Sequence, residues 1–328
     1  MLRALVLGIV QGLTEFLPIS SSAHLSIIPR LLGYRGPDLA FDVLLHFATL
    51  AAVVAYFARD LAALALSVVA PGRLGRREAA ARRRLLALLA LASVPTAVAG
   101  YLLQDWADGQ TSRPLRAAVW LIGTTSLLIG AELYARRRTR RARQAAGPAR
   151  PAAAGMATSP VANPSSLDER RVVLDVRSAR RPRSGRSHVA ASGPTADGEE
   201  ELTHLPAGKA LGIGLAQALA LVPGTSRSGI TIAAGLFQGV SRETAARFSF
   251  LLALPAILGA GILELGDLSQ AVESIPELAV GFLAAAISGI FAISTLIRLL
   301  RTHTLWPFIW YRLVAGGLFV ILLVRVRP

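Results

Sequence analysis

The sequence predicts an all-α polytopic membrane protein, with six transmembrane helices and two re-entrant helix hairpins arranged as an inverted repeat. Three observations support this fold class. First, 53% of the 328 residues are hydrophobic, and they gather in long uncharged runs. Second, arginine-rich stretches separate several of these runs. Third, one apolar run in each half of the chain is interrupted by a proline and a cluster of hydroxyl groups.

The charge composition agrees better with a membrane protein than with a nucleic-acid-binding protein. The net charge of +15 comes almost entirely from arginine, since Lys209 is the only lysine. The arginines cluster between apolar runs, where membrane topology accounts for them, so we expect no nucleic-acid partner. The chain has no cysteine, which excludes disulfide bonds and thiol chemistry.

The first half of the chain, residues 1–135, is predicted to hold a broken hairpin and three spans. Leu2 to Phe16 favours a helix of roughly 22 Å, too short for a hydrocarbon core of about 30 Å. Pro18 breaks this helix, and the serines that follow are good caps for a second short helix that ends near Leu32. Such a pair is typical of a re-entrant hairpin that enters and leaves on one side. The three spans are expected at about 40–58, 85–103 and 117–135.

Residues 136–206 have a different composition, with an arginine-rich start followed by proline, alanine, glycine and serine. This stretch has too little apolar periodicity to build a core, so we expect a disordered basic cytoplasmic insertion. A tolerated loop is the simpler interpretation, and a regulatory segment is the alternative.

The second half, residues 207–328, repeats the plan of the first. An apolar run at 207–222 is broken at Pro223, and a shorter segment follows at about 228–238. Three spans are expected at about 243–264, 277–299 and 306–325. The halves also match weakly in sequence at an offset of 206 residues: Gly8 with Gly214, Gln11 with Gln217, Ser20 with Ser226, and Ser22 with Ser228.

The distribution of arginine predicts the orientation in the membrane. The arginine-rich loops 59–84, 136–206 and 298–305 should be cytoplasmic, and the loops 104–116 and 264–276 extracytoplasmic. A topology with six crossings places every loop on its predicted side only if both broken segments are re-entrant and enter from opposite sides. Both termini are then outside. Inverted repeats with interrupted helices predict a site near the bilayer midplane, between the two breaks.

The first break carries a candidate catalytic and metal-binding set. Gln11 and Glu15 are four residues apart and share a helix face, and their oxygen atoms suit a hard divalent ion such as Mg²⁺ or Ca²⁺. The alternative is a buried Glu15 that is protonated or paired to an arginine. Ser20 is a candidate cap and phosphate donor. Ser21 and His24 are three residues apart on one face of the next helix, which favours a catalytic pair.

The second break carries a candidate phosphate clamp. Arg227 lies just after a Pro-Gly break and ahead of a short helix, and a guanidinium group there matches phosphate geometry. Further donors lie nearby: Ser226, Ser228 and Thr231. The starts of both second helices would direct positive dipole ends at the same anion. The alternative is an Arg227 that reaches the membrane interface. Asp42 and His46, near a span end, are expected to be interfacial.

Both breaks resemble signature motifs of one known family. Residues 11–24 (QGLTEFLPISSSAH) and 223–231 (PGTSRSGIT) are similar to the two motifs of the bacterial undecaprenyl-diphosphatases, the bacitracin resistance proteins. The resemblance covers the membrane portion of the chain, about 1–135 and 207–328. Insertion 136–206 is longer than the connection typical of that family.

The resemblance implies an integral enzyme of the bacterial plasma membrane that hydrolyses undecaprenyl diphosphate to the monophosphate and phosphate. This reaction recycles the lipid carrier of cell-wall synthesis and confers bacitracin resistance. The resemblance also implies a divalent metal and a site that faces the extracytoplasmic side. The following residues fall on functional positions of the family: Glu15, Ser21, His24, Ser226, Arg227 and Thr231. Gln11 falls where many members carry a second glutamate.

The reaction expected from these residues is in-line phosphoryl transfer on the terminal phosphate. Ser21 could attack with His24 as its base, His24 could attack directly, or a metal-activated water could attack. A transporter or flippase for an anionic lipid is the rival class, and a membrane scaffold leaves Glu15 and Arg227 unexplained. The expected partners are the prenyl diphosphate and membrane lipids, and a homodimer is left open.

Overall fold

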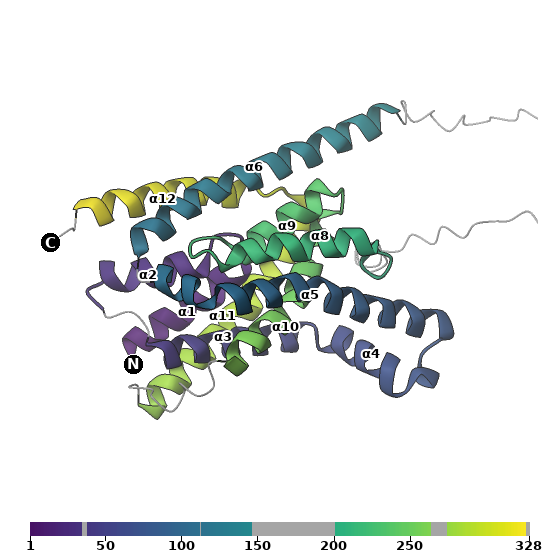
Figure 1. The fold of residues 1–328 in the computed structure, drawn as a ribbon, viewed down its shortest axis with the longest axis horizontal. Coiled ribbons are helices and arrows are strands. Elements are labelled where there is room, and N and C mark those ends of the chain that lie inside the picture. The colour runs from purple at the N-terminus through teal and green to yellow at the C-terminus, as the bar shows by residue number, and fades with distance from the viewer. Residues whose placement is uncertain (35–37, 112, 146–200, 264–273, 326–328) are drawn as a thin grey trace, which may run out of the picture.

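The computed structural model describes residues 1–34, 38–111, 113–145, 201–263 and 274–325, and their regular structure is helical (Figure 1). The helices of the first half are α1 (Leu2–Phe16), α2 (Ser21–Leu31), α3 (Leu39–Tyr56), α4 (Ala58–Val69), α5 (Arg76–Thr111) and α6 (Pro114–Ala145), with a short 3₁₀ turn η1 (Pro71–Arg73). Those of the second half are α8 (Ala207–Ala218), the 3₁₀ turn η2 (Leu219–Leu221), α9 (Arg227–Phe237), α10 (Arg242–Leu263), α11 (Ile275–Thr302) and α12 (Trp306–Arg325).

Within these described ranges, 6 helices are long and apolar enough to cross a membrane. They are α3, α5, α6, α10, α11 and α12, so the six predicted spans are confirmed. The remaining helices near the two sequence breaks are short: α1, α2, α8 and α9 have 15, 11, 12 and 11 residues.

Helix α6 extends further than hydropathy predicted. Helix α6 continues to Ala145, so the first ten residues of the predicted disordered insertion 136–206 are helical, and Glu201–Thr203 at its other end are helical too. Arginine and alanine are good helix formers, which lets the helix continue beyond its apolar part. The part of the insertion at 146–200 lies outside the described residues, and its disorder stays a prediction.

The loop predicted at 59–84 is also mostly helical. It holds α4, η1 and the start of α5, and α4 packs against α5. Arg82 on α5 contacts Asp60 on α4, with Nη1 and Oδ1 3.3 Å apart. Helix α4 is apolar but has only 12 residues, too few for a membrane span, so the search for spans placed it in a loop.

The short helices α1 and α8 each press closely against a long one. Helix α1 packs along α11, and a Cβ atom at Gly12 would overlap the carbonyl oxygen of Ala285. Helix α8 packs along α5, and a Cβ atom at Gly214 would overlap the carbonyl of Ala92. Glycine at these positions allows the backbones to approach closely, as in membrane helix pairs.

Buried arginine and aromatic side chains surround the ends of the short helices. Phe16 at the end of α1 meets Phe250 of α10 edge to face, with ring centroids 5.5 Å apart. Arg312 of α12 is fully buried, and its Nη1 donates to the carbonyl of Pro18 at 3.1 Å. Its Nε donates to Thr125 Oγ1 at 2.8 Å. Arg312 therefore anchors the first break to α6 and α12, a role that sequence reasoning did not identify.

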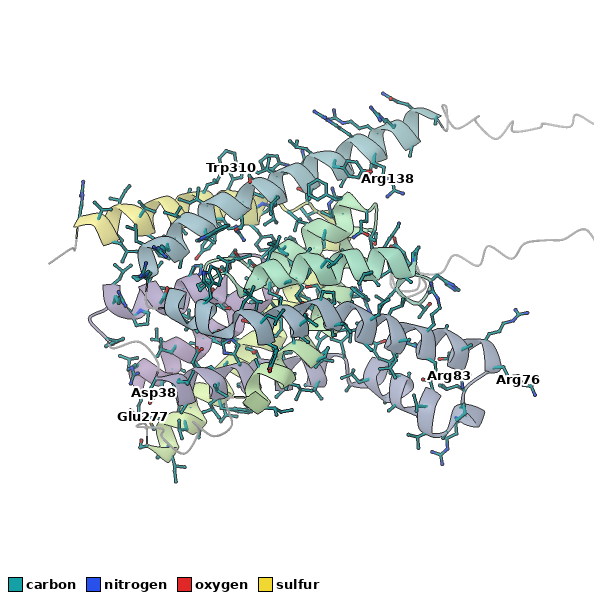
Figure 2. The ribbon with its side chains drawn as sticks, viewed as in Figure 1. Asp38, Arg76, Arg83, Arg138, Glu277 and Trp310 are labelled. Carbon is teal, nitrogen blue, oxygen red and sulfur yellow. The ribbon has the colours of Figure 1, made fainter. Side chains whose placement is uncertain are left out.

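Labelled charged side chains mark the two ends of the molecule. Figure 2 shows Arg76, Arg83 and Arg138 at one end and Asp38 and Glu277 at the other. In Figure 1, α1 and α2 lie toward the end with Asp38 and Glu277, and α8 and α9 extend toward the arginine-rich end. The two short helix pairs therefore approach the middle of the molecule from different sides.

Candidate active site

The two sequence breaks meet at one cavity of about 300 Å³. Glu15 at the end of α1, Ser21 at the start of α2, and Ser226 and Arg227 at the start of α9 line it. Helices α3, α5 and α10 complete the wall. The helix ends that the breaks create thus bring together side chains more than 200 positions apart.

Glu15 is the centre of the polar contacts. Its Oε1 accepts from Arg227 Nη2 at 2.9 Å, and its Oε2 accepts from Ser21 Oγ at 2.6 Å. Gln11 Nε2 also donates to Oε2, at 3.3 Å. Glu15 and Arg227 are 7% and 14% exposed, so this is a buried ion pair. The pairing matches the alternative interpretation of Glu15 as the partner of an arginine, and it places Arg227 at the site and not at the membrane interface.

Two further hydrogen bonds join the breaks directly. The backbone N–H of Gly224 donates to Ser22 Oγ at 3.0 Å, and Ser228 Oγ donates to the carbonyl of Leu17 at 3.1 Å. Gly224 has a φ of 92°, in the left-handed region that glycine adopts without strain. These bonds hold the start of α9 against the turn between α1 and α2.

Several predicted phosphate ligands belong to this framework and do not line the cavity. Ser20 caps α2 by accepting from the Ala23 N–H at 3.4 Å, and its φ of 74° is the one positive value of a non-glycine residue among those described. Ser228 bonds Leu17, as above, and Thr231 Oγ1 lies 2.6 Å from Ser249 Oγ. Of the predicted phosphate donors, Ser226 and Arg227 line the cavity.

His24 and Ser21 line different cavities in this structure, so the predicted Ser21–His24 catalytic pair is not formed here and stays a prediction. Its Nδ1 lies 2.7 Å from the carbonyl of Ser20, which can only accept, so Nδ1 carries a proton. In the neutral ring, Nε2 then accepts from the hydroxyl of Tyr311 at 2.8 Å. His24 faces a separate apolar cavity between α1, α2 and α12. Spacing placed Ser21 and His24 on one helix face, but Ser21, the first residue of α2, turns back toward Glu15.

Asp42 and His46 on α3 line the same cavity as Glu15, whereas the sequence predicted interfacial positions for both. His46 Nδ1 donates to the backbone carbonyl of Asp42 at 2.9 Å and lies 3.7 Å from its carboxylate. His46 Nε2 lies 3.9 Å from Glu15 Oε2. The signal in the sequence was an Asp and a His four residues apart at the start of a span, which share one helix face.

The predicted metal ligands offer suitable donor atoms. Among the described residues, Gln11 Oε1 is buried without a hydrogen-bond partner, next to the Glu15 carboxylate. The Asp42 carboxylate faces the same cavity as Glu15. These hard oxygen donors fit Mg²⁺ or Ca²⁺. No group of three His, Cys, Asp or Glu side chains in the described ranges is placed to hold a metal ion.

Comparison with known proteins identifies the family. The model of the bacitracin resistance protein BacA matches residues 4–158 and 184–318. The chain belongs to this family. A curated undecaprenyl-diphosphatase of Geobacter sulfurreducens is 38% identical over 322 residues, which cover 96% of either chain. The chain is also similar to an undecaprenyl-diphosphatase of Alcanivorax borkumensis, with 38% identity over 316 residues that cover 96% of either chain. An undecaprenyl-diphosphatase of Pelotomaculum thermopropionicum is 37% identical over 325 residues, which cover 99% of this chain and 97% of the relative. The membership indicated by the two motifs is confirmed.

Proposed function

We propose that this protein hydrolyses undecaprenyl diphosphate to undecaprenyl phosphate and inorganic phosphate in the bacterial plasma membrane. The observation that carries the proposal is the Glu15–Arg227 pair, held at 2.9 Å across the meeting point of the two breaks with Ser21 on the same carboxylate. Full-length relatives of the BacA family are named for this activity. The reaction returns the lipid carrier to cell-wall synthesis, and this recycling underlies bacitracin resistance.

Ser21 is the proposed nucleophile and Glu15 its base. As Ser21 Oγ bonds to the terminal phosphorus, its proton passes to Glu15 Oε2, 2.6 Å away. The bond to the bridging oxygen breaks, and its electron pair leaves with the prenyl monophosphate. Glu15 then gives its proton to solvent. Water attacks the phosphorus of the phosphoserine and its proton passes to Glu15. The bond from phosphorus to Ser21 Oγ breaks, Oγ takes the proton from Glu15, and inorganic phosphate is released. Direct attack by His24 is disfavoured, because its Nε2 lone pair is engaged by Tyr311.

Arg227 is the proposed clamp on the transferred group. Its Nη2 is held by Glu15, and its Nη1 is buried with no hydrogen-bond partner among the described residues. A preorganised donor of this kind stabilises charge that develops in the transition state. The start of α9 and the neighbouring Ser226 add backbone and hydroxyl donors at the same cavity.

A divalent ion is proposed as the cofactor, with Glu15 and Gln11 as ligands and Asp42 facing the same cavity. When bound, the ion neutralises charge on the diphosphate. Activity should be lost in chelator and return with added Mg²⁺ or Ca²⁺. Glu15→Gln also removes the proposed base, so its effect on the ion is measured as a higher Kd for the ion and not as turnover. Binding of the ion alone, measured by calorimetry, is a readout independent of turnover, and no binding with full activity in chelator would overturn this role.

The membrane topology is proposed to be two re-entrant hairpins, α1–α2 and α8–α9, in an inverted repeat. The short lengths of these helices and the separation of charge in Figure 2 support this proposal. With the arginine-rich end in the cytoplasm, the first hairpin and the site would open toward the extracytoplasmic side. Labelling of single cysteines in intact cells and in inverted vesicles tests this orientation. The homodimer stays a prediction, to be tested by the mass of the detergent-solubilised protein.

The deciding experiment measures phosphate release from a prenyl diphosphate by the purified protein in detergent with Mg²⁺ or Ca²⁺. We expect release by the parent protein and none by Ser21→Ala or Arg227→Ala. A folded, metal-supplemented parent that releases no phosphate, yet moves a labelled prenyl phosphate between leaflets of proteoliposomes, would replace the phosphatase with a transporter.

A further inference from the structure

We infer that Thr96, Gln217 and Thr225 form a subsite for the phosphate that remains on the lipid. This inference rests on the proposed function and extends it, since it assigns the two phosphates to different parts of the cavity. The three residues come from α5, the end of α8 and the turn before α9, and all line the cavity that Glu15 and Arg227 share.

The first observation is a set of buried polar atoms that lack partners. Gln217 and Thr225 are 1% and 5% exposed. Among the described residues, Gln217 Oε1, Thr225 Oγ1 and Arg227 Nη1 are buried without a hydrogen-bond partner. Buried polar groups are normally paired, and leaving one unpaired is costly. A ligand that fills the cavity can supply the missing partners.

The chemistry of these atoms fits a phosphate group. Thr225 Oγ1 and Arg227 Nη1 can both donate to an anion. Gln217 Nε2 donates to Thr96 Oγ1 at 3.2 Å, and Thr96 Oγ1 donates to the carbonyl of Gly214 at 3.3 Å. If the side-chain amide of Gln217 is flipped, the Thr96 hydroxyl donates to Gln217 Oε1 instead. Gln217 Nε2 then faces the cavity as a third donor.

The second observation is an apolar groove beside this part of the cavity. Helices α5 and α8 enclose about 590 Å³ along their outer seam, lined only by apolar residues such as Val94, Val98 and Leu215. Pro95 of the groove precedes Thr96 in the chain, and Ala218 of the groove follows Gln217. A prenyl chain needs an apolar surface near its phosphate, and α5 and α8 line both the groove and the cavity, through residues that are neighbours in the chain.

These positions divide the diphosphate between two groups of residues. The terminal phosphate is attacked at Ser21 and Glu15, which belong to α1 and α2. The retained phosphate lies at Thr225 and Gln217, with the prenyl chain directed into the groove. The free Nη1 of Arg227 donates to the diphosphate between these two phosphate positions. The subsite therefore binds the lipid product after the inorganic phosphate has left.

The test compares binding of the two products to Thr225→Val and Gln217→Leu in detergent. Farnesyl phosphate represents the lipid product and is compared with inorganic phosphate, both by calorimetry. We expect the Kd for farnesyl phosphate to rise about tenfold in each variant, the loss of one hydrogen bond to a charged group. The Kd for inorganic phosphate should change less than about twofold, because inorganic phosphate is expected to bind beside Ser21, where the terminal phosphate is attacked.

Two further variants control for folding. Thr225→Ser keeps the hydroxyl and should bind farnesyl phosphate as the parent does. Ser67→Ala removes a buried hydroxyl that donates to Leu64 within α4, away from the cavity, and should leave both constants unchanged. The inference is overturned if folded Thr225→Val and Gln217→Leu weaken only inorganic phosphate, or change neither ligand. A parent that binds farnesyl phosphate but releases no phosphate would reject the proposed function and leave the subsite standing.

Discussion

Removal of Arg227 should separate its structural role from its catalytic role. Arg227→Ala deletes the group 2.9 Å from Glu15 Oε1 and leaves a carboxylate that is 7% exposed without its cation. Breaking a buried ion pair from one side costs about 3–5 kcal/mol of unfolding free energy. We expect Arg227→Ala to lower the free energy of unfolding by about 3 kcal/mol, at the lower end of that range. The reason is that Ser21 and Gln11 still donate to the other oxygen of Glu15.

The double variant Glu15→Gln/Arg227→Ala distinguishes the two roles. It removes both charges, so it should recover most of the stability that Arg227→Ala loses. Turnover of folded Arg227→Ala should be about 10³-fold or more below the parent, the usual cost of losing an arginine from phosphoryl transfer. The double variant also lacks the proposed base Glu15, so it should regain stability but no turnover. Phosphate release at saturating substrate and thermal unfolding in the same detergent measure the two effects separately.

Arg242→Ala is the matched control. Arg242 Nη2 lies 2.7 Å from Oε1 of the fully buried Glu132, in an ion pair that does not line the active-site cavity. This variant should lose stability but keep the turnover of the folded parent. A folded Arg227→Ala variant that keeps parental turnover would refute the clamp, and an inactive but folded Arg242→Ala would show that turnover follows stability alone.

Four other tests address the remaining assignments. Ser21→Ala should fold as the parent does and form no phosphoenzyme in a rapid quench with labelled terminal phosphate, and a labelled variant would remove Ser21 as nucleophile. Tyr311→Phe removes the hydrogen bond to His24 Nε2 and should keep most of the parent's turnover. His24→Ala should lower the unfolding temperature further, because the imidazole also bonds the Ser20 carbonyl and packs against Phe319, yet the folded variant should still release phosphate. Complete inactivation of folded His24→Ala alone would make His24 the nucleophile. Arg312→Met should lower the unfolding free energy by about 3 kcal/mol or more in urea titration, because it leaves several buried acceptors unpaired. Deletion of 146–200 should leave phosphate release unchanged, and a correctly inserted but inactive deletion would give that segment a function.

Local signals in the sequence predicted the short helices well. Helix α1 ends at Phe16, as predicted, because Pro18 cannot continue it. Helix α9 begins at Arg227, with Ser226 as its cap. The extension of α6 to Ala145 was not predicted, because hydropathy reports only the part of a helix that lies in the membrane.

The role of individual polar residues was harder to predict. Ser21 and His24 share a helix face by spacing, yet one meets Glu15 and the other meets Tyr311. Asp42 and His46 looked interfacial, but the docking of α3 places both at the cavity. A side chain's partner depends on how its helix is rotated against the others, and spacing along one helix does not carry that information.

The sequence by itself determined the membrane class, the six spans, the two breaks and the family, because apolar length, proline and capping act over a few residues. Only the tertiary structure decided which polar groups face one cavity. Glu15 meets Arg227 because Gly12 and Gly214 let their helices pack closely against α11 and α5, bringing two breaks far apart in the chain into contact. Such contacts depend on long-range packing, in which each helix position is set by all its neighbours.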